Sequence, residues 1–115
     1  FYVPDWCATE SNNFLCVTFG MFDAIAMLEL GLASGTSTTG KGSTNAEQLE
    51  WCRKPIAVIP DKGEEDTGRK LVARLGWRGH LVKLEYPDGC KDPADCWQLG
   101  HGQWLYDEII KEMKR

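Results

Sequence analysis

The chain has 115 residues, of which 13 are Lys or Arg and 17 are Asp or Glu, so its formal net charge is −4. This length fits one compact domain, and an apolar fraction of 43% excludes a largely disordered chain. No stretch approaches the roughly 20 apolar residues of a membrane helix. The acidic balance also argues against a module that binds DNA non-specifically through a basic surface.

The sequence begins with Phe1 rather than Met, so we expect residues 1–115 to form a single domain of a longer protein. Its five cysteines include no C-x-x-C pair, and its two histidines lie far apart in the sequence. This pattern predicts neither a zinc site nor a disulfide framework. We therefore expect reduced thiols and a cytoplasmic protein.

The first half of the chain predicts two strands and two helices. Residues 14–19 form an apolar, β-rich run that predicts a buried strand, and residues 33–43 a weak strand that continues into a Gly-rich loop. Between them, residues 21–30 predict a helix that ends at Gly31. A short helix up to Cys52 follows the loop. The helical spacing of the apolar residues in and just after the first helix predicts one buried face. It comprises Met21, Ile25, Leu28 and Leu32.

The second half continues the alternation. Residues 55–60 predict a second buried strand, which a proline ends, and an acidic turn then leads into a helix that Gly76 closes. Residues 80–86 alternate like a strand exposed on one side. Asp92 and Pro93 have the residue types of a helix cap and first turn. Residues 101–114 predict an amphipathic terminal helix.

This order predicts an α/β fold, a Rossmann-like, mostly parallel four-stranded sheet flanked by helices on both faces. Because the strands at 14–19 and 55–60 are apolar on both faces, we expect both to be interior and parallel. Ligands of such folds bind beyond the carboxyl ends of the strands. The segments expected there are Phe19–Gly20, residues 40–42, Asp61 with its acidic neighbours, and residues 87–95.

Asp61 directly follows the second buried strand, and three more carboxylates, Glu64, Glu65 and Asp66, lie within five residues of it. Close carboxylates repel one another unless a cation lies among them, and hard oxygen ligands are those that Mg²⁺ prefers. Alternatively, the three later acids only complement the positive N-terminus of the following helix.

Two lysines are candidates for phosphate binding. Lys41 lies in the loop of residues 35–42, which matches G-x-x-x-x-G-K but has Gly42 where a P-loop needs Ser or Thr. We therefore expect Lys41 and the loop amides to contact a phosphate, or the loop to be only a surface connection. Lys91 precedes Asp92, and we expect it at the edge of the same site.

Three segments combine into one pattern: residues 19–28 (FGMFDAIAML), residues 61–68 (DKGEEDTG) and residues 86–95 (YPDGCKDPAD). Together they resemble the Toprim domain of bacterial and phage DNA primases, topoisomerases and some nucleases, over roughly residues 14–100. The last segment is more similar to the primase branch. The resemblance implies a Mg²⁺ or Mn²⁺ site for nucleotidyl transfer or phosphodiester cleavage, with a Glu after the first strand and a D-x-D after a later one.

The sequence departs from this pattern twice. Phe19 stands where the family has the Glu, and Gly63 stands where the second Asp of D-x-D belongs. Glu64 or Glu65 would then supply the missing carboxylate, and Asp23 remains close to the lost Glu. Our candidate site therefore comprises catalytic residues Asp23 and Asp61, metal ligands Asp61, Glu64 and Glu65, and phosphate-binding residues Lys41 and Lys91.

The leading hypothesis is a primase-type Toprim domain that binds a divalent metal and the phosphates of nucleotides or nucleic acid in DNA replication. Such a nucleotidyltransferase domain would share its chain with helicase or zinc-binding domains. The alternative is a catalytically degenerate Toprim module that binds nucleic acid or a partner protein. A third possibility is an unrelated doubly wound domain whose acidic turn is a phosphorylation or metal site.

Overall fold

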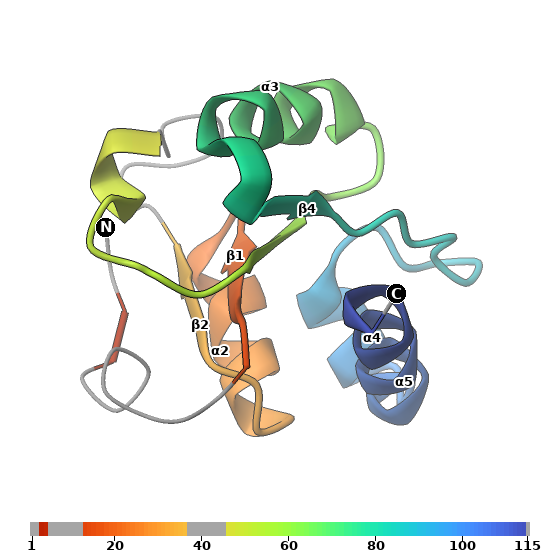
Figure 1. Cartoon of the computed structure of the whole chain (residues 1–115). Coiled ribbons are helices and arrows are strands. Elements are labelled where there is room, and N and C mark those ends of the chain that lie inside the picture. The colour runs from red at the N-terminus through yellow and green to blue at the C-terminus, as the bar shows by residue number, and fades with distance from the viewer. Residues whose placement is uncertain (1–2, 5–12, 37–45, 115) are drawn as a thin grey trace.

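The structure is a computed structural model that describes residues 3–4, 13–36 and 46–114. A parallel sheet forms its centre, with the strands in the order β2-β1-β3-β4 (Figure 1). The strands are β1 (Leu15–Thr18), β2 (Ser34–Thr36), β3 (Ile56–Ile59) and β4 (Gly79–Leu81). The α-helices are α2 (Met21–Glu29), α3 (Glu65–Leu75), α4 (Pro93–Gln98) and α5 (Gly102–Met113), with short 3-10 turns η1 (Ala46–Leu49) and η2 (Gly76–Arg78). Every strand pairing in these residues is parallel.

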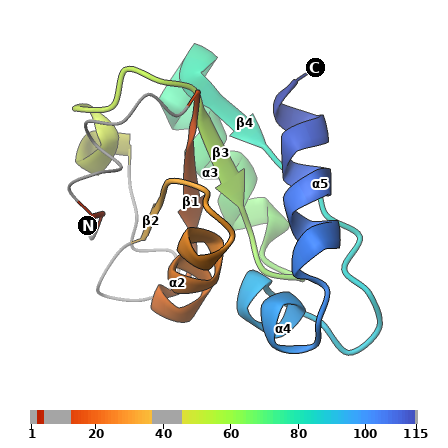
Figure 2. The same ribbon diagram turned by 90° about the horizontal axis from the view of Figure 1, so that it is seen from below.

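Helices cover both faces of the sheet, because successive side chains of a strand point to opposite sides. Val17 and Val58 pack in one apolar cluster with Leu71 of α3. Ala57, the neighbour of Val58, packs in a second cluster with Leu105 of α5. Accordingly α3 lies on one face, and α2, α4 and α5 lie on the other (Figures 1 and 2). The predicted four-stranded α/β fold is thereby confirmed.

The strand order places the ligand crevice expected of doubly wound folds at the carboxyl ends of β1 and β3. These two strands are interior neighbours, with Thr18 paired to Ile59, as expected for residues 14–19 and 55–60. The chain leaves β1 toward α2 on one face and leaves β3 toward α3 on the other. Loops that diverge in this way open the crevice where ligands of doubly wound folds bind.

The fourth strand is shorter than residues 80–86, and this prediction was wrong. The strand β4 ends at Leu81, and Val82 makes one more bond, from its N–H to the carbonyl of Val58 at 3.0 Å. The neighbouring strand then reaches Pro60, which has no N–H to donate. The ladder cannot continue, so the chain leaves the sheet and crosses beside the end of β3.

The predicted buried face of α2 is correct only toward its end, where Leu28 is partly buried and Leu32, after the helix, is 4% exposed. The buried residues of the helix are Asp23, Ala24, Ala26 and Met27, whereas Met21 and Ile25 are 37% and 43% exposed. The helix is apolar around most of its circumference, so the periodicity does not identify which side packs. The other predicted helices, α3 up to Gly76, α4 after Asp92 and the terminal α5, are present. None of the helices in the described part of the chain is long and apolar enough to span a membrane.

Candidate metal centre

Three aspartates from separate elements meet at the carboxyl ends of β1 and β3. Asp23 lies in the first turn of α2, Asp61 follows β3, and Asp92 is the N-cap of α4. One carboxylate oxygen from each lies within 4.8 Å of the others. Asp23 and Asp61 are only 5% and 3% exposed, and Asp92 is partly buried. We call these three residues the Asp triad.

Asp23 is fixed from both sides. Its Oδ1 accepts a hydrogen bond from the backbone N–H of Ala94 in α4, at 2.9 Å. On its other side, a Cβ placed on Gly20 would lie 3.1 Å from Asp23 Oδ2, which is tighter than an ordinary contact. Glycine at the end of β1 therefore leaves room for this carboxylate, and the contact with α4 brings Asp23 to the loop of Asp92.

Backbone hydrogen bonds hold the Asp61 and Asp92 loops together. The N–H of Lys62 donates to the carbonyl of Lys91 at 2.7 Å, which joins the residue after Asp61 to the residue before Asp92. Asp92 Oδ1 accepts the N–H of Asp95 at 2.8 Å, and this is the helix cap that the sequence predicted. Asp92 thus caps α4 and contributes an oxygen to the Asp triad at the same time.

The electrostatics of the Asp triad favour a bound cation. The pKa of Asp23 is raised to about 8, chiefly by burial. The Ala94 N–H lowers this pKa, whereas the charges of Asp61 and Asp92 and a hydrogen bond to Asp61 contribute to the rise. Carboxylate oxygens so close together are the hard donors that Mg²⁺ and Mn²⁺ accept. A cation among them would offset the repulsion that shifts Asp23, so these residues fit a divalent metal.

We expect the metal-free protein to lose stability as the pH rises. The folded-state pKa of Asp23 is raised from an ordinary 3.8 to about 8. The contribution of Asp23 to the free energy of unfolding is therefore full below about pH 4 and is lost as the pH rises through about 8. Urea denaturation in EDTA should give a lower free energy of unfolding at pH 8 than at pH 5. Asp23→Asn should flatten this difference, whereas Asp88→Asn, at an exposed loop position, should not. An unchanged slope in Asp23→Asn would contradict the assignment.

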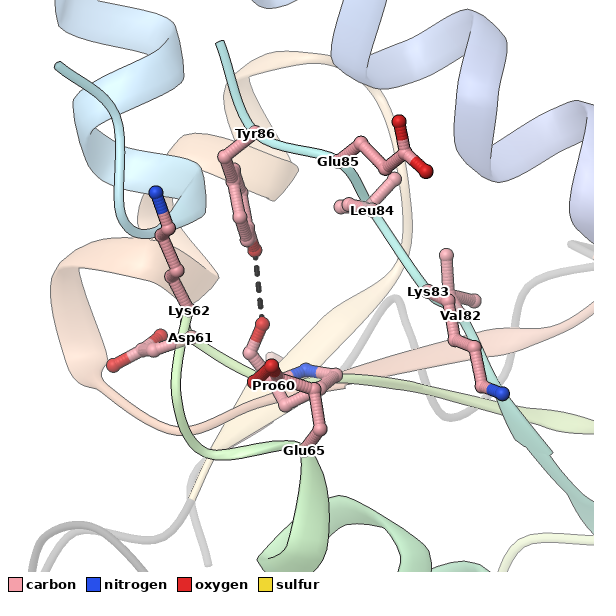
Figure 3. A pocket seen from close by; sticks show the side chains of 9 residues that line it. All are labelled: Pro60, Asp61, Lys62, Glu65, Val82, Lys83, Leu84, Glu85 and Tyr86. Carbon is pink, nitrogen blue, oxygen red and sulfur yellow. Dashed lines mark hydrogen bonds between the residues drawn. The ribbon is translucent and has the colours of Figure 1, made fainter. Parts of the chain in front are cut away.

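The predicted site residues separate into two groups. Asp23 and Asp61, the predicted catalytic pair, come together in the Asp triad. Glu64 is the N-cap of α3 and Glu65 is its first residue, and neither belongs to the described carboxylates that converge there. Glu65 instead lines an adjoining pocket of about 300 Å³ together with Asp61 (Figure 3).

Of the two predicted phosphate-binding lysines, Lys91 lies in the described part of the chain. Lys91 is exposed and directly precedes Asp92, at the edge of the Asp triad. Lys41 lies outside the described residues. Lys62, which follows Asp61 and lines the pocket, is a further exposed cation at this edge.

Phe19, at the position where the resemblance to Toprim leads us to expect a Glu, is a core residue. It is 4% exposed and packs in the cluster of Val17 and Leu71, on the α3 side of the sheet. Asp92 is the member of the Asp triad that the sequence did not assign as a ligand, because its role as a cap explained its presence. Its place in a loop expected at the carboxyl ends of the strands was the signal that could have identified it.

No protein-family profile matches the chain, and no curated protein matches it. Among solved structures, the fold is similar to a primase-domain chain in the complex described as bacteriophage T7 lagging-strand DNA polymerase interacting with primase domains of two gp4 subunits bound to an RNA/DNA hybrid and dTTP. The TM-score is 0.64 and the identity 21%, over 85% of this chain and 54% of that chain. This chain thus spans about half the length of that one, and the likeness shows a shared α/β fold.

Proposed function

We propose that the chain is a primase-type Toprim-like domain that binds Mg²⁺ or Mn²⁺ through Asp23, Asp61 and Asp92. The convergence of these three carboxylates at the crevice carries the proposal. Each of the three sequence segments that resemble Toprim contributes one of them: residues 19–28, 61–68 and 86–95. The likeness of the fold to a phage primase domain supports the same function. Through this metal the domain binds the phosphates of a nucleotide or nucleic acid in DNA replication.

The residues of the site have separable roles in this proposal. A divalent ion held by the Asp triad supplies positive charge that neutralises phosphate oxygens. Asp61 and Asp92 orient their oxygens from loops that a backbone hydrogen bond joins. Asp23 holds a proton near neutral pH in the metal-free protein and gives it up when it becomes a ligand. The exposed Lys62 and Lys91 at the edge add positive charge for phosphate.

Mn²⁺ binding to single-site variants tests this proposal. Titration followed by the electron paramagnetic resonance signal of free Mn²⁺ should show binding to the wild type and at least about tenfold weaker binding to Asp23→Asn, Asp61→Asn and Asp92→Asn. Asn preserves the helix cap at position 92, so that variant should keep its fold. Asp88→Asn changes the same charge at an exposed position and should bind like the wild type. Equal binding by all four variants would contradict the proposal.

A catalytically degenerate module is the second candidate function. The observation that favours it is Phe19, because a buried phenylalanine can neither bind a metal nor transfer a proton. General acid–base groups typically contribute about 10²- to 10⁴-fold to a rate. Incubation of the purified chain with Mg²⁺, nucleoside triphosphates and single-stranded DNA distinguishes the two functions. Primer synthesis or cleavage would favour the nucleotidyltransferase, whereas metal binding without turnover would favour the module.

We also propose the kind of protein and the compartment to which the chain belongs. We place the chain as one domain of a longer cytoplasmic replication protein, alongside helicase or zinc-binding domains. Cys52, Cys90 and Cys96 are free and buried, which agrees with a reducing compartment. Lys41, Glu64 and Glu65 stay predicted ligands of phosphate and metal.

A further inference from the structure

A hydrogen bond joins the end of β3 to Tyr86, which follows β4 in a segment outside the sheet. The hydroxyl of Tyr86 donates a hydrogen bond to the carbonyl of Pro60 at 2.9 Å. Figure 3 shows this bond beside Asp61, with the Tyr86 ring along the wall of the pocket. Since the Pro60 carbonyl belongs to the peptide group that includes the Asp61 nitrogen, this bond acts on the backbone that carries a triad carboxylate.

The backbone around Asp61 is held by three hydrogen bonds at two successive peptide groups, Pro60–Asp61 and Asp61–Lys62. The Asp61 carbonyl accepts the N–H of Glu64 at 2.9 Å, and the Lys62 N–H donates to the Lys91 carbonyl at 2.7 Å. Both of these bonds join backbone atoms. The third bond, to the Pro60 carbonyl, comes from a side chain. Tyr86 is therefore the member of this set that a substitution can remove without changing the path of the chain.

Tyr86 is itself held in place by helix α5. Its ring lies 6.5 Å from that of Trp104 in α5, at a tilt of 55°, and both side chains pack against the cluster that contains Leu105. Such tilted aromatic pairs are stabilising. The orientation of the hydroxyl is thus set by the core, whereas its hydrogen bond lies at the edge of the candidate metal centre.

We propose that Tyr86 is a positioning residue for the metal centre: its hydroxyl fixes the Pro60–Asp61 peptide so that the Asp61 carboxylate faces Asp23 and Asp92. This inference rests on the proposed function. It assigns to Tyr86 no contact with the metal or with the reacting atoms. Groups that orient metal ligands commonly alter metal affinity without binding the metal.

The test compares Tyr86→Phe with Tyr106→Phe. Tyr106, on α5, also packs partly buried against the same apolar cluster, so its variant removes a hydroxyl from a similar setting. Mn²⁺ affinity is measured by electron paramagnetic resonance well below the melting temperature, and melting curves are recorded in EDTA. Tyr86→Phe should weaken Mn²⁺ binding about threefold to tenfold, the effect of one net hydrogen bond. Tyr106→Phe should change it less than about twofold.

A purely structural role for Tyr86 gives a different result. Tyr86→Phe would then lower the melting temperature in EDTA and leave the Mn²⁺ dissociation constant equal to that of the wild type, which would overturn the inference. An equal loss of affinity in Tyr106→Phe would overturn it as well, because the effect would not be specific to the bond with Pro60. A wild type that binds no Mn²⁺ would overturn the proposed function itself, so the two failures are distinguishable.

Discussion

Phe19→Glu should destabilise the protein by more than about 4 kcal/mol. Loss of a buried phenylalanine side chain typically lowers the free energy of unfolding by about 3–5 kcal/mol, and a carboxylate in the same apolar cluster adds a desolvation penalty. Because a domain of this kind is stable by only about 5–15 kcal/mol in total, this loss should remove a large part of the free energy of unfolding. Urea denaturation followed by circular dichroism measures the change.

The neighbouring phenylalanine provides the control. Phe22 is 79% exposed in the first turn of α2, whereas Phe19 is 4% exposed. Phe22→Glu makes the same chemical change and should alter the free energy of unfolding by less than about 0.5 kcal/mol. If Phe19→Glu unfolded at the same denaturant concentration as the wild type, position 19 would not be a core position. The chain could then accept the family's Glu there.

Mn²⁺ should raise the melting temperature of the wild type by about 10 °C at a hundredfold excess over its dissociation constant. Binding to the folded state alone contributes about 2.7 kcal/mol at this excess, and a domain of this size gains a few degrees for each kcal/mol. Asp61→Asn should abolish the shift. In EDTA the same variant should be as stable as the wild type or slightly more so, because it removes a buried negative charge that lies close to Asp92 and Asp23.

The opposite behaviour would support a purely structural role for the acids. If they served only to cap helices, the wild type would melt at the same temperature with and without Mn²⁺, and each substitution would cost a small amount of stability. Asp88→Asn controls for the change in net charge. It should keep the full Mn²⁺ shift, since Asp88 is exposed in the loop before Asp92.

Much of the architecture could be predicted from the sequence because it depends on local patterns. Residues 14–19 and 55–60 are apolar on both faces, which only interior parallel strands satisfy. The end of the fourth strand could not be predicted in this way, because it depends on the absence of an N–H at Pro60 in the neighbouring strand. The buried face of α2 was predicted only in part, since it is set by packing against the sheet and α4 and by the position of Asp23.

The candidate site was predictable only in part for a related reason. Asp61 was identified because it follows a buried strand, and Asp23 because a short segment resembles Toprim. Asp92 joins them through contacts far apart in the sequence, the Lys62 to Lys91 bond and the Ala94 to Asp23 bond. Sequence neighbours of Asp61, such as Glu64 and Glu65, are close in the chain but begin a helix that leads to the opposite face.

The location of bound Mn²⁺ in a crystal tests the metal centre most directly. Crystals of the full 115-residue chain soaked in MnCl₂ would be measured for anomalous scattering. We predict an anomalous peak within coordination distance of oxygens of Asp23, Asp61 and Asp92, and none in crystals of Asp61→Asn. A map of the soaked wild type without a peak among these three residues, or with its peak beside Glu64 and Glu65 instead, would contradict the proposed centre.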